Sequence, residues 1–374
     1  MRIVHISTLY YPFVGGLEIA VQRVAEEQAK LGHEVYVISS DAYAENKLEE
    51  GIVTVVRVRS WKSRYPFLIV PRDIPMDILK GADVVLGWGH TYYFVYKIVR
   101  KAKIKFGKSI MQYFIGVDYL KHHYNPLIRI AGYSYQKLLT QSLAKIVDLP
   151  LVTNEYEKRL LRERYGLDAI VVPHGIDEKY LSLPNMAENF RKKYGVEGRI
   201  IAYIGRIHPT KGLDILVKAF IRAAKEEPNT VLVIAGKGDE GYLKRCLRIA
   251  KKAGVENKIR VLGYVSEEDK IALIDASDIV VLPTRHAGES YPLLINEVLA
   301  RGKRFVMTRG VIASKWVEES DVGKVADPDP HSLAQALVEE LRSRNDEKDN
   351  ETIKILTWGE VAYKLLDILW QLPV

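Results

Sequence analysis

The chain has 374 residues, 48% hydrophobic and 27% charged, a length that accommodates two or three domains that each bury a core. This balance excludes a disordered or fibrous chain, and no apolar stretch approaches the roughly 20 residues of a membrane-spanning helix. The chain opens directly on a strand-like run, so we expect no signal peptide and a cytoplasmic location. The single cysteine, Cys246, lies in a helical pattern and is expected to pack in a core.

The net positive charge is confined to the first half of the chain. Residues 1–195 hold 28 Lys and Arg against 20 Asp and Glu, whereas the remaining residues hold 27 of each. No acid lies between Asp83 and Asp118, an interval with six basic residues from Lys97 to Lys108. Two interpretations stay open, a solvated helix face and contact with an anionic partner.

Short β-branched runs alternate with amphipathic segments along the chain. In the first half, strand-like runs cover residues 2–7, 34–39, 52–58, 83–86 and 170–172, and a helical pattern covers 17–31. The alternation restarts with runs at 199–204, 230–235, 258–262, 278–282 and 304–307. This pattern predicts an α/β protein with two doubly wound, Rossmann-like parallel sheets.

The domain boundary is expected in the polar stretch from Pro173 to Glu197, which contains no long apolar run. We therefore place one domain at residues 1–190 and a second at 191–350. Residues 351–374 form a last helical pattern with no strand after it, and we expect this helix to pack back on the first domain. Ligands of open parallel sheets bind outside the carboxyl ends of the strands, so chemistry is expected there.

Two strand ends of the first domain carry candidate ligand-binding residues. Gly15 and Gly16 precede a helix, where small residues let the backbone approach a ligand and the helix N-terminus favours an anion. His90 follows another strand at the same edge of the sheet. A simple tight turn and a structural histidine are the alternative interpretations.

The first strand of the second domain leads into a loop with two cations, Arg206 and Lys211. Thr210 is a good N-cap, which would place Lys211 in the first helical turn, where the helix dipole disfavours a cation. A bound anion removes this conflict, so the loop predicts a site for a diphosphate. A solvated loop is the alternative.

Two glutamates follow the fourth strand of the second domain. Pro292 is well placed early in a helix, so Glu289 would lie in the preceding loop and Glu297 inside the helix. Their backbones would then be roughly 12 Å apart, longer than the ~5–9.5 Å carboxyl separations of glycosidases. We expect them to bind two parts of one ligand, although solvated surface glutamates are equally common.

Two other motifs look like a dinucleotide site and a metal site, but we expect neither. The glycines from Gly236 to Gly241 fit a dinucleotide fingerprint in letters but follow the second strand of the domain, whereas that fingerprint belongs to the first. Asp327 and Asp329 flank a proline and are best explained as a turn before a helix. No cluster with metal-ligand spacing appears, and we expect no metal site.

In combination, these motifs resemble the retaining GT-B glycosyltransferases of the family 4 type, a group that includes glycogen synthase and the phosphatidylinositol mannosyltransferases. The resemblance covers nearly the whole chain. It is carried by Gly15-Gly16 with Glu18, Gly32 to Val35, Pro173 to Asp177, Gly205-Arg206 with Lys211-Gly212, Gly236 to Gly238, Leu262 to Val265, and Pro283 to Glu297. It implies the GT-B architecture, with an acceptor-binding N-terminal domain and a nucleotide-sugar-binding C-terminal domain.

The resemblance also implies roles for individual residues. Glu289 would contact the transferred hexose and His90 the donor sugar, and these two are the expected catalytic residues. The expected donor-binding residues are Gly15, Gly16, Arg206 and Lys211 at the diphosphate, Glu297 at the ribose, and Leu293 and Leu294 beside it. The co-substrate would be a nucleoside-diphosphate sugar, such as a UDP-sugar or GDP-mannose, with no metal or other cofactor.

The chain departs from the family pattern at three places: Tyr291-Pro292, His174, and Gly302 to Phe305. A nucleotide-sugar epimerase and a non-catalytic nucleotide-sugar-binding protein of the same fold stay open as alternatives. Aromatic residues from Tyr92 to Tyr96 lie among the basic residues after His90, which favours a lipid-linked or otherwise anionic acceptor and peripheral contact with the inner membrane face. No nucleic-acid partner is expected.

Overall fold

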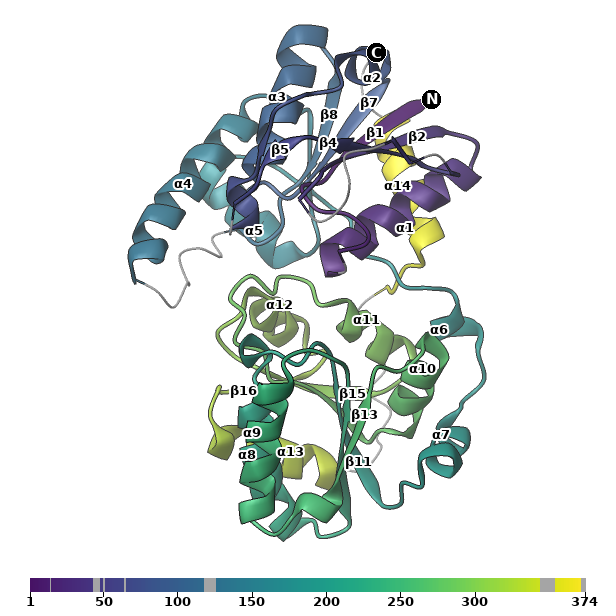
Figure 1. Cartoon of the computed structure of the whole chain (residues 1–374), viewed down its shortest axis with the longest axis vertical. Helices are drawn as coiled ribbons and strands as arrows, with labels where there is room; N and C mark the ends of the chain where they lie inside the picture. Colours follow the sequence, from purple (N-terminus) through teal and green to yellow (C-terminus); the bar gives the residue numbers. More distant parts are fainter. Residues whose placement is uncertain are drawn as a thin grey trace. The chain divides into compact units, whose positions relative to one another are not determined.

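The chain folds into two α/β units (Figure 1). The computed structural model describes residues 1–13, 15–42, 48–49, 51–63, 65–117, 126–343 and 354–370. Unit 1 comprises Met1–Gly175 and Leu356–Val374, and unit 2 comprises Ile176–Ile355. Each unit is built around one large sheet, so the expected fold of two doubly wound domains is confirmed.

The sheet of unit 1 is parallel except at one edge. Its strand order is β10-β9-β8-β7-β1-β2-β4-β3, and only β3 runs antiparallel to its neighbour among the pairs described. The strands are β1 (Arg2–Ile6), β2 (Glu34–Ser40), β3 (Leu48–Glu49), β4 (Thr54–Val58), β7 (Val84–Trp88), β8 (Ser109–Tyr113), β9 (Leu149–Val152) and β10 (Ile170–Val171). Strand β7, in the middle of the sheet, is buried along its whole length because helices cover both faces.

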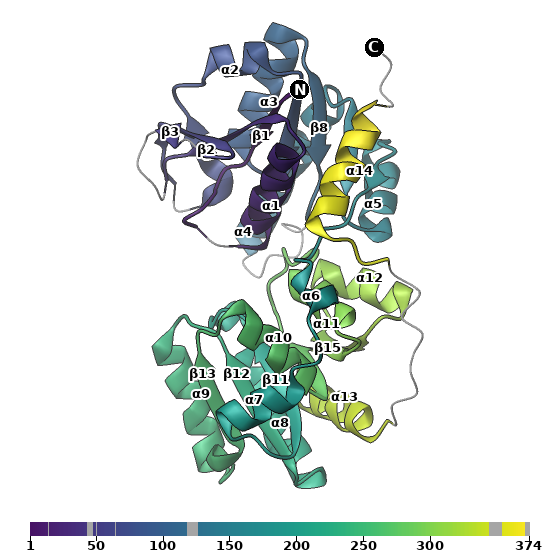
Figure 2. The ribbon, with the colours of Figure 1, turned by 90° about the vertical axis from the view of Figure 1, so that its right-hand side faces the viewer.

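Opposite faces of this sheet bind different helices. Val4 and Ile6 of β1 share a core with Phe94 and Ile98 of α3 (Tyr93–Phe106), whereas His5, which points to the other face, is hydrogen-bonded to Gln28 of α1 (Gly16–Lys30). The last helix, α14 (Trp358–Trp370), packs beside α1 (Figure 2). The remaining helices of unit 1 are α2 (Met76–Gly81), α4 (Pro126–Ala144) and α5 (Glu155–Tyr165). The C-terminal helix thus belongs to unit 1, although it follows unit 2 in the sequence.

A small hairpin extends from the sheet of unit 1. It consists of β5 (Ser60–Trp61), a 3-10 turn (Pro66–Leu68) and β6 (Val70–Pro71). The Lys97 ammonium of α3 donates to the carbonyl of Pro71 at 3.0 Å, and the Tyr135 hydroxyl of α4 donates to the carbonyl of Phe67 at 2.9 Å. The hairpin is therefore fixed to two helices of unit 1.

Unit 2 has an entirely parallel sheet. Its order is β13-β12-β11-β14-β15-β16. The strands are β11 (Arg199–Ile204), β12 (Thr230–Ala235), β13 (Ile259–Gly263), β14 (Ile279–Leu282), β15 (Arg304–Thr308) and β16 (Lys324–Ala326). The helices are α6 (Lys179–Ser182), α7 (Ala187–Tyr194), α8 (Leu213–Glu226), α9 (Glu240–Lys252), α10 (Glu267–Ala276), α11 (Leu293–Ala300), α12 (Ile312–Ser320) and α13 (Pro330–Arg342).

One apolar cluster joins β11 and β12 to α8, α9 and α13. Phe220 of α8, Leu337 of α13 and Cys246 of α9 are all fully buried in it. Burial of a large aliphatic or aromatic side chain contributes about 1.5–3 kcal/mol, so this cluster holds three helices on one face of the sheet. Cys246 is a core residue, as the sequence predicted.

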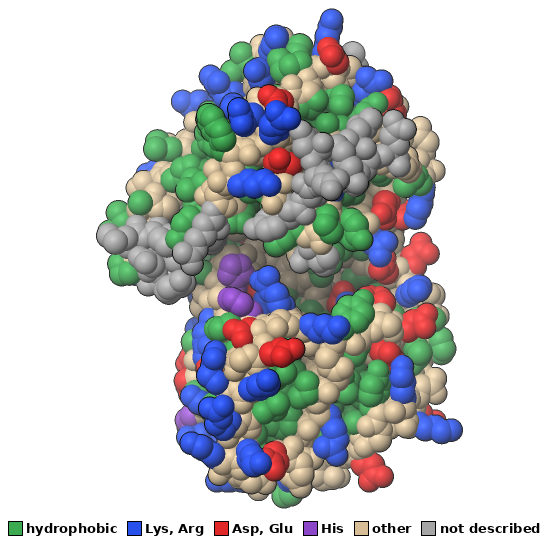
Figure 3. All heavy atoms as spheres, viewed as in Figure 1, with side chains coloured by type: hydrophobic (Ala, Val, Ile, Leu, Met, Phe, Trp, Pro, Cys, Tyr) green, Lys and Arg blue, Asp and Glu red, His purple; other side chains and the backbone are tan. Residues whose placement is uncertain are grey.

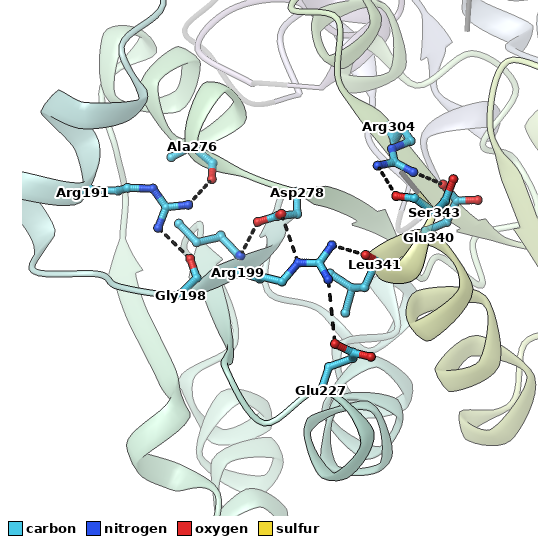
Figure 4. Close-up of polar contacts among 11 residues, drawn as sticks. Arg191, Gly198, Arg199, Glu227, Ala276, Asp278, Arg304, Glu340, Leu341 and Ser343 are labelled. Atoms are coloured by element: carbon cyan, nitrogen blue, oxygen red, sulfur yellow. Dashed lines mark hydrogen bonds and ion pairs between the residues drawn. The ribbon is translucent and has the colours of Figure 1, made fainter. Parts of the chain in front are cut away.

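An arginine network closes the amino-terminal edge of the sheet in unit 2 (Figure 4). Arg199, at the start of β11, is 3.3 Å from the carboxylate of Asp278 and donates to the carbonyl of Leu341 at the end of α13. Arg191 of α7 donates to the carbonyls of Gly198 and Ala276 at 2.7 and 3.1 Å. These contacts fix α7 and α13 to the amino ends of the strands. They do not involve the carboxyl ends of the strands, where the candidate site residues lie.

The boundary at residue 190 must be corrected. The units meet at Gly175 and Ile176, because α6 and α7 pack on unit 2. Arg301 holds this connecting segment: its guanidinium pairs with Asp275 at 2.8 Å and donates to the carbonyl of Leu183 at 2.8 Å. A polar, proline-containing stretch that resembles a linker in sequence is thus part of unit 2.

Strands β8 and β9 were not predicted. Residues Ser109–Tyr113 include Gln112, and Leu149–Val152 include Pro150, so neither segment is a continuous β-branched run. Tertiary packing nevertheless places both inside the sheet of unit 1. Within the described parts of the chain, no helix combines the length and apolarity needed to cross a bilayer.

Candidate functional site

The carboxyl ends of β11 and β14 bring two predicted site residues together in unit 2. The Lys211 ammonium lies 2.5 Å from Oε2 of Glu289, and the Thr284 hydroxyl donates to the same oxygen at 2.9 Å. Both ionic side chains are largely buried, with 24% of the Lys211 and 15% of the Glu289 side chain exposed. A partly buried pair of this kind is weakly screened by solvent, so a ligand that bound either partner would have to compete with the other.

The loop that carries Lys211 differs from the prediction. Pro209–Lys211 form a 3-10 turn capped by the His208 side chain, and α8 begins only at Leu213, so Thr210 is not the N-cap of that helix and Lys211 lies before it. Gly212, between the two, has φ +68°, and a Cβ there would lie 1.8 Å from the carbonyl oxygen of Pro283. The close approach of the two loops therefore requires glycine and places Lys211 beside Glu289.

A second ion pair fixes the same two loops. Arg285 binds both carboxylate oxygens of Asp214 at 2.9 and 2.8 Å, and its backbone N–H donates to the carbonyl of Thr210 at 2.7 Å. The Tyr242 hydroxyl of α9 donates to Asp214 at 2.5 Å. Bidentate pairs restrict geometry more than a single contact does, so this arrangement holds Lys211 and Glu289 in register.

Arg206 presents its guanidinium differently. The residue is exposed, and no described side chain pairs with it, while its carbonyl accepts a hydrogen bond from the Tyr203 hydroxyl at 2.8 Å. The backbone is thus anchored and the charged group is open to solvent. Such a cation can bind an anionic ligand without first breaking an ion pair.

Glu297 lies on α11 and Glu289 in the loop before that helix, as expected from the sequence. Its Oε1 is 2.9 Å from the ammonium of Lys270, on α10, and only 12% of its side chain is exposed. Burial raises the pKa of Glu297, and the charge of Lys270 opposes that rise. Leu293 and Leu294 form the first turn of the same helix and are half-buried.

In unit 1, Gly15 is the residue before α1, and no side chain caps that helix. A Cβ on Gly15 would lie 2.3 Å from Oε2 of Glu18, a buried glutamate in the first turn. The carboxylate of Glu18 thus lies against the helix N-terminus, which favours negative charge. Gly16 is exposed, so the backbone there is accessible to a ligand.

His90 is fully buried in unit 1. Its ring lies 5.4 Å from that of Phe114, and its Nε2 is 3.1 Å from the side-chain nitrogen of Gln136 on α4. Because that amide also donates to the carbonyl of Gly116 at 2.9 Å, its second proton points to His90, whose Nε2 accepts and whose Nδ1 carries the proton. Burial lowers the pKa of His90 to about 3, so the ring is neutral.

The structure thus brings together Lys211 with Glu289 in unit 2, whereas Gly15, Gly16 and His90 belong to unit 1. Sequence reasoning missed Thr284, Arg285 and Lys270. Thr284 and Arg285 lie within the motif that contains Glu289, which was a usable signal. Lys270 follows a run of acids at the start of α10, and nothing in the pattern distinguished it from a solvated lysine.

The two motifs set aside from the sequence have structural explanations. A Cβ on Gly238 would lie 2.1 Å from the carbonyl oxygen of Ile207, so this glycine allows the strand-end loops to approach each other. The Asp329 carboxylate accepts from the backbone N–H groups of His331 and Ser332 and caps α13. Among the described residues, no three His, Cys, Asp or Glu side chains gather in a way that could hold a metal ion.

Two family models match the chain in succession. Residues 14–180 match the model "Glycosyltransferase Family 4", and residues 186–355 match "Glycosyl transferases group 1". Together they span most of both units.

Curated relatives match over part of their length. A phosphatidyl-myo-inositol mannosyltransferase of Mycolicibacterium smegmatis is 23% identical over 63% of this chain, and a D-inositol 3-phosphate glycosyltransferase of Corynebacterium glutamicum is 28% identical over 62%. The matches span 60% and 59% of those two proteins.

Solved structures match over the whole chain. Sucrose-phosphate synthase from Thermosynechococcus elongatus aligns with a TM-score of 0.75 and 17% identity, covering 99% of this chain and 98% of that one. HepE of Anabaena, solved in complex with UDP and glucose, aligns with a TM-score of 0.73 and 14% identity over the full length of both chains. At these identities, the likeness shows a shared fold. With both family models matched in order along that fold, the chain belongs to the GT-B glycosyltransferases, with a family 4 domain followed by a group 1 domain.

Proposed function

We propose that this chain is an enzyme that transfers a hexose from a nucleoside-diphosphate sugar to an acceptor, with retention of configuration and without a metal ion. The observation that carries the proposal is the Lys211 and Glu289 ion pair at the carboxyl ends of β11 and β14. The curated relatives bear names of sugar transferases, and HepE was solved with UDP and UDP-glucose, which supports a nucleotide-sugar donor.

The chemistry follows from charge. When the bond between sugar and diphosphate breaks, negative charge develops on the departing phosphate, and preorganised cations stabilise it. Arg206, open to solvent, and Lys211 supply two cations for this task. As Lys211 turns to the phosphate, Glu289 is freed to accept a hydroxyl of the hexose. Gly15 and Gly16 are assigned to the diphosphate as backbone donors, and Glu297 to the ribose.

Product analysis tests this proposal. The full chain is incubated with UDP-, GDP- and ADP-sugars and candidate acceptors, and the anomeric configuration of the product is read by NMR. A glycoside with the configuration of the donor supports the proposal. An epimerised nucleotide sugar would instead favour the epimerase, and binding without any product would favour a nucleotide-sugar-binding protein; neither alternative is favoured by the relatives.

We further propose a lipid-linked or anionic acceptor at the cytoplasmic membrane face. The aromatic residues of α3 do not support this in the way the sequence indicated, because Phe94 is buried in the core and Tyr92, Tyr93 and Tyr96 are half-buried. Lys101 and Lys105 of this helix are exposed, whereas Lys103 is half-buried and pairs with Asp148 at 2.6 Å.

The adjacent hairpin instead exposes apolar side chains that could contact a membrane. Trp61, Tyr65 and Leu68 are 62%, 41% and 42% exposed. The same segment carries exposed basic residues, Arg59, Lys62 and Arg72; the Arg72 guanidinium lies 5.7 Å from the Trp61 ring centroid, and Arg59 lies 4.0 Å from Asp73. Figure 3 shows basic side chains with hydrophobic ones between them over the part of unit 1 that Figure 1 labels α3 and β5. Interfacial aromatics beside lysines and arginines favour an anionic lipid surface.

Sedimentation with anionic vesicles tests this surface. The wild type should co-sediment at low salt and less at high salt, where screening shortens the electrostatic reach. Trp61→Ser, and replacement of Lys101, Lys103 and Lys105 by Glu, should each reduce binding. Replacement of Lys244, Lys251 and Lys252 of α9 by Glu is the matched control. If the wild type does not co-sediment with vesicles at low salt, or if the control variant loses as much binding as the others, the proposed membrane surface is wrong. The acceptor would then be soluble.

A further inference from the structure

A buried lysine outside the predicted site joins two carboxylates in unit 2. The Lys270 ammonium of α10 lies 2.9 Å from Oε1 of Glu297 and 3.0 Å from Oε1 of Glu267. It also lies 5.4 Å from the centre of the Tyr180 ring, and the Tyr180 hydroxyl donates to Glu267. Only 20% of the Lys270 side chain is exposed. Three groups from α6, α10 and α11 therefore fix this ammonium in one place.

The contact leaves Glu297 with one oxygen engaged. Within the described part of the chain, its hydrogen-bonded side-chain contact is Lys270, through Oε1, so Oε2 is available to a ligand. A carboxylate that is nearly buried is costly to keep charged without a partner, and removal of the partner favours its protonated form. Lys270 therefore controls both the charge and the direction of the group that we assign to the ribose.

We propose that Lys270 is a positioning residue for the donor nucleotide, which acts by holding Glu297 ionised with Oε2 turned to accept the ribose hydroxyls. This inference rests on the proposed function, in which Glu297 binds the ribose. The Tyr180 and Glu267 contacts serve as the support that keeps Lys270 from turning to solvent. Donor affinity thus depends on a residue that reaches the nucleotide only through another side chain.

A double-mutant cycle tests this coupling. Binding of UDP and of GDP to the full chain is measured by calorimetry, and the tighter nucleotide is used for the wild type, Lys270→Met, Glu297→Gln and the double variant. Loss of a hydrogen bond to a charged group corresponds to about 10- to 100-fold in affinity. Each single variant should lose affinity in that range, and the double variant should lose no more than Glu297→Gln alone.

Two further measurements separate positioning from a merely structural role. The wild type should prefer the ribonucleotide to its 2′,3′-dideoxy analogue, and Lys270→Met should lose that preference, whereas Lys270→Arg should restore it. Lys193→Met is the control, because it breaks an ion pair between α7 and Asp269, which lies next to Lys270 on α10. This variant should leave nucleotide affinity and the preference for the ribonucleotide unchanged. Lys270→Gln replaces Lys270→Met if the latter does not fold.

Distinct results overturn the inference and the proposed function. If Glu297→Gln weakens nucleotide binding but Lys270→Met does not, or if the two losses multiply in the double variant, Lys270 does not act through Glu297. If Glu297→Gln itself leaves nucleotide affinity unchanged, the ribose assignment fails, and the positioning role fails with it.

Discussion

The strand-end loops of the two units are built on different principles. In unit 2, ionic contacts join these loops and the helices that follow them: Lys211 pairs with Glu289, Arg285 with Asp214 of α8, and Lys270 of α10 with Glu297 of α11. In unit 1 the candidate positions are two glycines and a fully buried neutral histidine. Under the proposed function, unit 2 therefore balances the charge of the ligand, whereas unit 1 offers backbone groups and an uncharged buried ring.

Removal of Lys211 should have the largest effect on activity. Lys211→Ala deletes one cation from the proposed diphosphate site and leaves Glu289 without its ionic partner, so kcat/KM for the donor should fall by about 100-fold. Lys244→Ala, at an exposed lysine of α9, is the control. Steady-state kinetics at saturating acceptor measure the effect, and wild-type kinetics would place the diphosphate elsewhere.

Substitution of the two glutamates should distinguish binding of the hexose from binding of the ribose. Glu289→Gln should slow transfer by about 10- to 100-fold with little change in nucleoside-diphosphate affinity, because its proposed contact is the hexose. Glu297→Gln should weaken the free nucleotide as well. Turnover rates and calorimetric titrations of both variants measure the contrast. Equal losses of nucleotide affinity in both would remove the distinction between the two carboxylates.

Substitution of His90 should lower the stability of the protein more than its nucleotide affinity. His90→Ala removes a buried ring that packs on Phe114 and leaves the Gln136 amide without its acceptor, so the free energy of unfolding should fall by about 2–3 kcal/mol. Thermal and urea unfolding measure this loss. Nucleotide affinity should stay near that of the wild type, and a large loss of affinity in a stable His90→Ala protein would show that His90 itself takes part in nucleotide binding.

The smallest effect is expected at Gly15. The atom that a Cβ would meet is the flexible end of Glu18, which can move, so Gly15→Ala should change the free energy of unfolding by less than about 1 kcal/mol. Gly15→Ala in a Glu18→Ala background should be unaffected in stability. A loss of several kcal/mol would show that the contact between Glu18 and the helix N-terminus supports unit 1.

The sequence predicted more of unit 2 than of unit 1, for physical reasons. Buried parallel strands such as β11 are β-branched runs, and Glu289 and Glu297 fell in the loop and on the helix that Pro292 indicated. Strand β9 was missed because it contains Pro150, and α6 was assigned to the wrong unit because Arg301 binds that segment through backbone carbonyls, which leave no pattern in the sequence.

The sequence could not show which charged side chains of the candidate site pair with each other. Lys211 and Glu289 are 78 residues apart, and Lys270 and Glu297 are 27 apart, so only the meeting of strand-end loops and helices shows that they pair. The burial of His90 was equally invisible, because a histidine after a strand can face either solvent or core. Patterns in the sequence located the edge of the sheet, and tertiary packing determined which side chains act together there.

In the proposed function, cations of unit 2 bind the donor diphosphate without a metal ion. The most direct test is a calorimetric titration of the full chain with the tighter of UDP and GDP, in chelator and again with added Mg²⁺, for the wild type and Lys211→Ala. We expect equal wild-type affinity in both buffers and a loss of about 10- to 100-fold in Lys211→Ala. Binding that requires Mg²⁺, or binding that is unchanged in Lys211→Ala, would contradict it.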